Sequence, residues 1–319
     1  MEQETSKNKI KILAVVGPTA SGKSALAVEL AKRYGGEVVS CDSMQIYKHL
    51  CIATAKPTAQ EMQGIPHHLI DFLEPTEAFS VAEYVRLAGE VIEDIAARGK
   101  LPIVCGGTGL YFSSLLHNIT FSPAGSDAAY RRELEARAAT EGAQALLDEL
   151  REYDPLSAEK LHPNNLKRII RAMEHYKLTG QTITEQNERS RRLPARYDAL
   201  VFGITFADRQ ALYERINRRV DVMCKAGLIE EAKWYFAQEN FATASAAIGY
   251  KELQPYFEGA CDLPTALDSL KKETRHYAKR QLTWFKREED ICWLYADGQD
   301  VHSLAEQAAQ EIQKREFLV

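Results

Sequence analysis

The sequence predicts an α/β protein, in which helices cover both faces of an open parallel sheet and a separate all-helical domain is inserted into the chain. Three observations lead to this fold class. A glycine-rich motif joins an apolar run to an amphipathic helix, further short apolar runs alternate with helical patterns, and a long stretch without strands interrupts them. Alternation of strands and helices favours a parallel sheet, because parallel strands need a crossover connection between them.

The first predicted element is a strand, a loop and a helix in immediate succession. Residues 11–16 (KILAVV) are apolar and rich in β-branched side chains, as buried parallel strands are. The glycine-rich loop GPTASGKS follows at residues 17–24. Residues 24–34 carry apolar side chains at helical spacing, and Gly35 and Gly36 come next as a helix stop.

Four more short apolar runs predict buried strands. They are residues 37–41 (EVVSC), 101–106 (LPIVCG), 199–204 (ALVFGI) and 291–296 (ICWLYA). Helical patterns lie between or after these runs, at residues 81–99, 209–227 and 301–316. We therefore expect helices on both faces of the sheet.

The pattern changes between residues 116 and 196. This stretch has no convincing strand, and amphipathic helices run through residues 128–140, 141–152 and 164–180. We predict three parts of the chain: a first part of the core (1–115), a helical insertion domain (116–196), and a second part of the core with C-terminal helices (197–319).

Composition argues against a membrane or disulfide-rich protein. No run approaches the roughly 18 apolar residues of a spanning helix, and residues 1–9 are polar, unlike a signal sequence. Six cysteines lie far apart without zinc spacing: Cys41, Cys51, Cys105, Cys224, Cys261 and Cys292. We expect a cytoplasmic protein with no membrane partner, and a monomer is the simplest assembly.

The charge is unevenly distributed along the chain. The net charge is −5, yet residues 160–196 and 271–287 each carry a net charge of +6, which leaves about −17 for the rest. Such segregation favours a basic face that could bind nucleic acid. Solvated helix faces are the alternative explanation for both segments.

The glycine-rich loop fits the pattern G-x-x-x-x-G-K-S completely, so we expect a P-loop NTPase-like core. The loop assigns phosphate binding to Gly17, Thr19, Ala20, Ser21, Gly22, Lys23 and Ser24. Glycines let backbone N–H groups converge on phosphate oxygens, Lys23 adds positive charge, and the Ser24 hydroxyl can bind Mg²⁺. The motif identifies phosphates but not the molecule that carries them.

The usual hydrolytic partner of this motif, an apolar strand ending in Asp, is missing. Residues 101–105 run instead into Gly106-Gly107-Thr108-Gly109, so an ordinary ATPase is disfavoured. Asp42 follows the strand at 37–41 and would face the same crevice, where a carboxylate could accept a proton or bind Mg²⁺. The alternative role for Asp42 is to cap a turn.

Eight motifs in order carry a family resemblance. They are GPTASGKS (17–24), DSMQIY (42–47), TAKPT (54–58), HHLID (67–71), GGTGLY (106–111), KRIIRAME (167–174), AIGYKE (247–252) and TRHYAKRQLTWFK (274–286). Together they resemble the tRNA dimethylallyltransferases, also called tRNA isopentenyltransferases, over about residues 11–290. The chain lacks the zinc-finger tail of eukaryotic members, so we expect the bacterial type.

The resemblance implies transfer of a dimethylallyl group from dimethylallyl diphosphate to the exocyclic amine of the adenosine just 3′ of the tRNA anticodon. Diphosphate is then the leaving group, which explains why no hydrolytic carboxylate is needed. By resemblance Lys23 and Mg²⁺ on Ser24 stabilise the diphosphate, Asp42 is the general base, and Thr108 positions the amine or a phosphate oxygen. Gln45 reads the adenine edge, beside Ser43 and Met44 of the same motif.

The resemblance also implies contacts with the anticodon stem-loop. The residues are Lys167, Arg168, Ile169, Ile170 and Arg171; Gly249, Tyr250 and Lys251; and Arg275, Lys279, Arg280 and Gln281. Trp284 and Phe285 could stack on bases, with core packing as the preferred alternative for at least one of them. Arg215 and Arg219 would approach the diphosphate, with surface ion pairs as an equal alternative.

Three other functions stay open at this point. An adenylate isopentenyltransferase would use a free nucleotide, a P-loop small-molecule kinase would use ATP, and a non-catalytic RNA-binding protein would need no phosphate loop. The two basic segments and the helical insertion argue against a free nucleotide as acceptor. The sequence also departs from the family at Cys51-Ile52-Ala53, where members commonly have Asp-Ile-Gly, so the loop there could pack differently.

Overall fold

The computed structural model describes residues 9–121, 125–238, 241 and 243–318. These residues form two compact units. One unit combines the described residues up to Leu116 with those from Arg196 onward, and the other spans His117–Ala195. The predicted insertion limits, 116 and 196, each lie one residue from the limits of the second unit.

The first unit is built on a six-stranded parallel sheet in the order β3-β2-β4-β1-β5-β6. The strands are β1 (Ile10–Val16), β2 (Gly36–Ser40), β3 (His67–His68), β4 (Leu101–Gly106), β5 (Tyr197–Thr205) and β6 (Ile291–Tyr295). The parallel sheet and its five apolar strands are confirmed. Strand β3 was not predicted, because two residues are too short to give a pattern.

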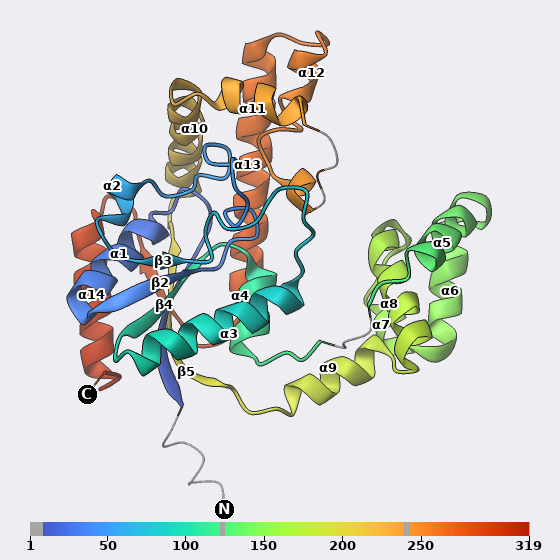
Figure 1. The fold of residues 1–319 in the computed structure, drawn as a ribbon, viewed down its shortest axis with the longest axis horizontal. Helices are drawn as coiled ribbons and strands as arrows, with labels where there is room; N and C mark the ends of the chain where they lie inside the picture. The colour runs from blue at the N-terminus through green and yellow to red at the C-terminus, as the bar shows by residue number, and fades with distance from the viewer. Residues whose placement is uncertain (1–8, 122–124, 239–240, 242, 319) are drawn as a thin grey trace, which may run out of the picture. The chain divides into compact units, whose positions relative to one another are not determined.

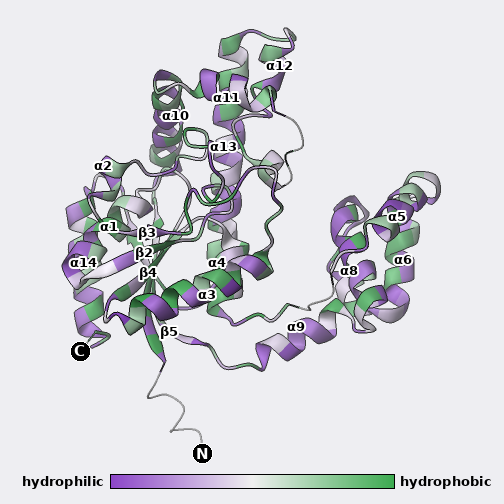
Figure 2. Ribbon diagram, viewed as in Figure 1, coloured by the Kyte–Doolittle hydropathy of each residue, from purple (hydrophilic) through white to green (hydrophobic). Residues whose placement is uncertain are grey.

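Helices cover both faces of the sheet, as predicted (Figure 1). On one face, α1 (Lys23–Tyr34) and α14 (Val301–Lys314) bury Leu26 and Leu304 against the strands. On the other face, α3 (Val81–Ala97) and α4 (Gly109–Leu116) bury Ile92 and Phe112. Hydrophobic residues gather on the strands and on the helix sides that meet them (Figure 2).

A second group of helices stands beyond the carboxyl ends of the strands (Figure 1). It consists of α10 (Arg209–Lys225), α11 (Leu228–Phe236), η2 (Thr243–Ala246), α12 (Gln254–Phe257) and α13 (Leu263–Phe285), with the short α2 (Ala59–Met62) nearby. Helix α13 begins after Asp262, whose side chain accepts a hydrogen bond from the Thr265 N–H and so caps the helix. These helices supply one wall of the site described below.

The second unit is all-helical. It contains α5 (Ala128–Glu141), α6 (Ala143–Tyr153), α7 (Pro155–Glu159), η1 (Pro163–Asn165), α8 (Leu166–Thr179) and α9 (Ile183–Arg191). Leu134, Leu146 and Ile169 are fully buried in its core. Helix α9 was not predicted, because its sequence ITEQNERSR is polar and only Ser190 is buried.

A buried carboxylate links β2 to β3 and to the segment that precedes β4. Glu37, at the start of β2, is 6% exposed. Arg98 donates to both oxygens of Glu37, and the Glu37 Oε2 lies 2.8 Å from His68 Nε2. The hydrogen bonds from Arg98, followed by that with His68, hold the pKa of Glu37 at about 2 despite its burial.

We predict that Glu37→Gln lowers the free energy of unfolding by about 2 kcal/mol at pH 7. A depressed folded-state pKa stabilises the fold above the unfolded pKa near 4.5, and this contribution is lost as the pH falls toward 2. The gap between wild type and variant, measured by denaturant unfolding, should therefore narrow from pH 5 to pH 3.

The exposed pair of Arg86 and Glu90 provides the control. Glu90→Gln should change the free energy of unfolding by less than about 0.5 kcal/mol at either pH. If Glu37→Gln lowered the free energy of unfolding equally at pH 7 and pH 3, the ionised carboxylate would not be what stabilises the fold.

Candidate functional site

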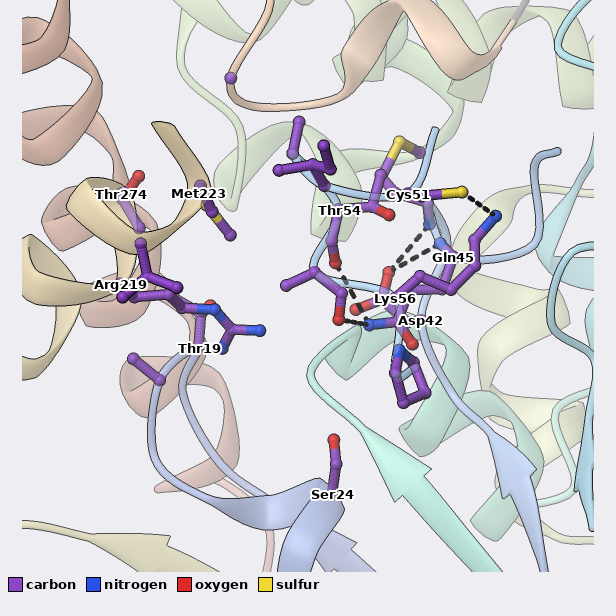
Figure 3. Close-up of a pocket in the computed structure, with 18 of the residues that line it drawn as sticks. Thr19, Ser24, Asp42, Gln45, Cys51, Thr54, Lys56, Arg219, Met223 and Thr274 are labelled. Carbon is purple, nitrogen blue, oxygen red and sulfur yellow. Dashed lines mark hydrogen bonds between the residues drawn. The ribbon is translucent and has the colours of Figure 1, made fainter. Parts of the chain in front are cut away.

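The loops at the carboxyl ends of β1 and β2 meet at one large cavity in the first unit. Its volume is about 840 Å³. It is lined by the phosphate loop, by residues 42–45 after β2, by residues 51–58, and by side chains of α10 and α13. In Figure 3, Arg219, Met223 and Thr274 face Asp42, Gln45 and Thr54 across this space, with Ser24 at its floor. The crevice predicted beside the phosphate loop is therefore present.

The phosphate loop folds as its glycines require. Gly17 and Gly22 have φ angles of 150° and 96°. A Cβ on Gly17 would lie 2.8 Å from the Ile204 carbonyl oxygen, so only glycine fits there. Helix α1 begins at Lys23 after Gly22, and no side chain caps its N-terminus. An uncapped N-terminus with free N–H groups at the floor of a cavity is suited to an anion.

Three cations surround this loop. The Lys23 Nζ donates to the Pro18 carbonyl at 3.3 Å, and the Arg215 Nε donates to the Ala20 carbonyl at 3.0 Å. Burial lowers the pKa of Lys23 and of Arg219. No carboxylate of the described residues lies within ion-pair distance of Lys23, Arg215 or Arg219. Desolvated cations without a counter-ion destabilise a protein, so this arrangement fits a ligand that brings several negative charges.

The Gln281 side chain on α13 ties the phosphate loop to the loop after β4. Its Oε1 accepts the Thr19 N–H at 2.8 Å, and its Nε2 donates to the Gly107 carbonyl at 2.9 Å. Gln281 is 5% exposed. A Cβ on Gly107 would lie 2.2 Å from the Gln281 Nε2. The amide predicted to read RNA thus has two protein partners in this structure and acts as a strut between two loops.

Asp42 caps the turn after β2 and also lines the cavity. Its Oδ1 accepts the N–H groups of Met44 (2.9 Å) and Gln45 (3.3 Å), so it caps the turn after β2. It also lines the cavity. Because both bonds go to Oδ1, the Oδ2 has no donor among the described residues. One carboxylate oxygen fixes the turn and the other is available to a ligand.

Thr108 contacts a residue that lines the cavity but does not line the cavity itself. Its Oγ1 accepts the Ser43 N–H at 3.0 Å and donates to the Ser43 Oγ at 3.3 Å. Its own N–H donates to the Cys41 carbonyl at 3.1 Å. Ser43 lines the cavity, whereas Thr108 is not among its lining residues. Thr108 therefore fixes the turn that carries Asp42 and Ser43.

Gln45 has one free polar atom. Its Nε2 donates to the carbonyls of Thr54 (3.2 Å) and Ala55 (3.0 Å), as the dashed lines in Figure 3 show. Its Oε1 has no protein donor within the described parts of the chain. Gln45 lines the cavity, so it can offer an acceptor of fixed orientation to a ligand.

The predicted RNA contacts divide into exposed and buried side chains. Lys167 and Arg168 on α8, and Lys279 and Arg280 on α13, are exposed. Arg171 pairs with the buried Glu174 at 2.8 Å, and Arg275 donates to the Asn217 Oδ1 at 2.7 Å. Ile169, Ile170 and Tyr250 are at most 4% exposed, so their side chains serve packing and offer no surface to RNA. Gly249 lines the cavity, and the Lys251 side chain is 60% exposed.

Trp284 and Phe285 pack within the first unit. The Trp284 Nε1 donates to the Ser113 Oγ at 2.8 Å, and its ring covers Gly109. Phe285 is fully buried and meets Phe112 edge-on. The packing alternative is therefore confirmed for both side chains.

Sequence reasoning missed several residues that line the cavity. Tyr277 is one of them, and burial raises its pKa, so it stays a neutral phenol. It lies four residues before Gln281 on α13, and this helical spacing could have identified it. Lys56, Met223 and Thr274 also line the cavity. Lys56 and Thr274 lie in the motifs TAKPT and TRHYAKRQLTWFK, whereas nothing in the sequence around Met223 points to a site.

Metal and membrane features are limited. The described residues contain no cluster of three or more His, Cys, Asp or Glu side chains that could hold a metal ion. In the same residues, none of the helices combines the length and apolar character needed to cross a membrane. Ser24, the metal ligand that the sequence predicts, lies at the N-terminus of α1 and is exposed to the cavity.

The fold and the site define a phosphate-loop protein whose cavity places a cationic loop opposite a carboxylate-bearing wall. Comparison with known proteins specifies the family. The family model described as IPP transferase matches residues 45–288. The chain therefore belongs to the IPP transferase family.

Known relatives support this assignment. The chain is 49% identical over 291 residues to the tRNA dimethylallyltransferase of Caldanaerobacter subterraneus subsp. tengcongensis, covering 90% of this chain and 92% of the relative. Two solved structures are also similar. The full-length tRNA isopentenylpyrophosphate transferase of Bacillus halodurans has a TM-score of 0.70 at 43% identity, covering 97% and 99% of the two chains. A eukaryotic dimethylallyltransferase acting on tRNA has a TM-score of 0.81 at 31% identity, covering 96% and 79%.

We predict that Gln281→Met weakens the binding of inorganic diphosphate by about tenfold and lowers the free energy of unfolding by roughly 1–3 kcal/mol. Methionine has a similar length but leaves the Thr19 N–H and the Gly107 carbonyl without their partner. Calorimetric titration and denaturant unfolding measure the two effects.

Thr283→Ala is the matched control on the same helix, because the Thr283 hydroxyl bonds the carbonyl of Lys279 in its own helix and no other group of the described residues. It should leave both quantities near the wild-type values. Wild-type affinity for diphosphate in Gln281→Met would contradict the role of the strut.

Proposed function

We propose that this protein is a tRNA dimethylallyltransferase. It transfers the dimethylallyl group of dimethylallyl diphosphate to the exocyclic amine of the adenosine 3′-adjacent to the anticodon and releases diphosphate. The observation that carries the proposal is the cavity itself, where the desolvated Lys23 and Arg219 lie beside Arg215 with no ion-pair partner among the described residues, and where Asp42 and Gln45 offer free oxygens. The names of the relatives, with identities near 50% over 90% of the chain, point the same way.

The cationic wall suits the leaving group. Breaking the allylic carbon–oxygen bond leaves the electron pair on diphosphate, so negative charge develops there in the transition state. Lys23, Arg215 and Arg219 would stabilise this charge together with the N-terminus of α1, and the burial of Lys23 and Arg219 would strengthen the effect. The hydroxyl of Ser24 would hold Mg²⁺ with diphosphate oxygens and water as the other ligands. Mg²⁺ binds in this way without a cage of protein carboxylates and adds neutralising charge.

The opposite wall suits the acceptor. The adenine amine becomes a better nucleophile as it loses a proton, and Asp42 would accept that proton on the oxygen that does not cap the turn. Gln45 would accept a hydrogen bond from the edge of the base through Oε1. Thr108 would act through Ser43, by holding the turn that carries Asp42 in place.

The RNA would be bound outside the cavity by basic side chains. The target base must leave its stack to enter the cavity, at a cost of a few kcal/mol. Phosphate contacts from Lys279 and Arg280 on α13, and from Lys167 and Arg168 on α8, would offset this cost. We expect a monomer that acts in the cytoplasm on the anticodon stem-loop.

The test is transfer of radiolabelled dimethylallyl from its diphosphate to unmodified tRNA, with free AMP as a parallel acceptor. Wild-type protein should label tRNA and not AMP. Asp42→Asn and Lys23→Met should each lower kcat by about 10²–10³-fold, because each removes a group that acts on charge in the transition state.

Two exposed residues provide controls for these variants. Asp94→Asn and Lys32→Met remove the same charges from the surface helices α3 and α1 and should keep activity within about twofold of wild type. Label on AMP, or phosphoryl transfer from ATP with no use of dimethylallyl diphosphate, would overturn the proposed function.

A further inference from the structure

The loop of residues 50–56 forms one wall of the cavity and has an unusual support. The loop closes a single turn through hydrogen bonds from the Ala55 N–H to the Ile52 carbonyl and from the Lys56 N–H to the Cys51 carbonyl, both 2.9 Å. As in the first turn of a helix, the N–H groups at its start have no acceptor within the turn.

A single carboxylate on α11 accepts all of these N–H groups. The Glu231 Oε2 accepts the N–H of Cys51 at 2.8 Å and of Ile52 at 2.7 Å, and its Oε1 accepts the N–H of Ala53 at 2.9 Å. Consecutive N–H groups that converge in this way form an anion-binding nest. The nest is thus filled by a side chain about 180 residues away in the sequence.

Glu231 is held in turn by the AIGYKE motif. The Tyr250 hydroxyl donates to the Glu231 Oε1 at 2.8 Å, and the Tyr250 ring is fully buried and stacks on Tyr235 with ring centroids 4.0 Å apart. Gly249 has a φ of 120°, and a Cβ there would lie 2.9 Å from the Ala53 Cβ. The motif therefore supports Glu231 through Tyr250 and leaves room for the loop at Gly249.

The supported loop fixes Gln45. The carbonyls of Thr54 and Ala55 accept both bonds of the Gln45 Nε2, which leaves the Gln45 Oε1 for the cavity. Ala55 has a φ of 51°, in the left-handed region, so its carbonyl direction depends on the loop being held. No contact in this chain of interactions involves the phosphate loop.

We propose that Glu231 is a positioning residue for the acceptor base: it fixes the 50–56 loop, and through that loop it sets the orientation of the Gln45 amide toward the adenine. This inference rests on the proposed function. It assigns to the AIGYKE motif a role in building the acceptor wall, in place of direct contact of Tyr250 with RNA. The donor wall does not depend on it.

The test compares the kinetic constants for the two substrates in Glu231→Gln. Glutamine presents a single acceptor oxygen and turns an N–H₂ group toward backbone donors, so part of the nest loses its partner. KM for an unmodified anticodon stem-loop should rise by about tenfold or more, in line with the loss of hydrogen bonds to a charged group. KM for dimethylallyl diphosphate and the affinity for inorganic diphosphate should stay within about twofold.

Glu230→Gln is the matched control, since Glu230 is the exposed neighbour on the same helix and should match wild type. A double variant tests the route through Gln45. If Glu231 acts through Gln45, then Gln45→Ala combined with Glu231→Gln should be no weaker toward RNA than Gln45→Ala alone. If the losses of RNA affinity in the two single variants were fully additive in the double variant, the proposal would be overturned. Equal changes in KM for both substrates would also overturn it, and would indicate a general effect on stability.

A measurement without substrate separates this inference from the proposed function. Hydrogen exchange at the amides of Cys51, Ile52 and Ala53 should be at least tenfold faster in Glu231→Gln than in wild type, and unchanged in Glu230→Gln. Unchanged exchange in Glu231→Gln would refute the loop support. A wild-type protein that fails to label tRNA would refute the proposed function and with it the positioning role.

Discussion

Desolvated positive charge around the phosphate loop is the constraint on which the site depends. Lys23, Arg215 and Arg219 line one cavity, burial lowers the pKa of Lys23 and of Arg219, and no carboxylate of the described residues neutralises any of the three at close range. A fold that keeps such charges out of water carries a cost that a polyanionic ligand removes. The same charges would then stabilise any negative charge that develops on that ligand, so these cations would serve both binding and catalysis.

The position of this charge relative to the opposite wall is set by backbone contacts. The Cys41 N–H donates to the Cys105 carbonyl at 2.7 Å, and a Cβ on Gly106 would lie 2.0 Å from the Cys41 oxygen. The ends of β2 and β4 therefore leave no space for a side chain at Gly106. Gln281 fixes the phosphate loop to the residues that follow β4. The donor and acceptor walls are thus held by rigid strand ends and by one buried amide.

The sequence predicted most of the fold because the strands of a parallel sheet are continuous apolar runs. The elements that it did not predict include β3, which has two residues, α9, whose sequence lacks an apolar face, and the short α4. The phosphate loop was predictable because all its parts are local. Gln281 and Glu231 could not be assigned their roles, since their partners lie 262 and about 180 residues away. The two interpretations of Asp42 could not be separated from the sequence, because one oxygen of this carboxylate caps the turn while the side chain also lines the cavity.

The absence of a hydrolytic carboxylate after β4 separates this site from an ATPase, and it leads to the most direct test of the account. The measurement is the stoichiometry of diphosphate release from dimethylallyl diphosphate, with and without unmodified tRNA. We expect one diphosphate for each dimethylallyl group transferred, and release at least about 100-fold slower without RNA. Comparable release in the absence of RNA would show that the cavity activates water, and would contradict the assignment of diphosphate as the leaving group of a transfer reaction.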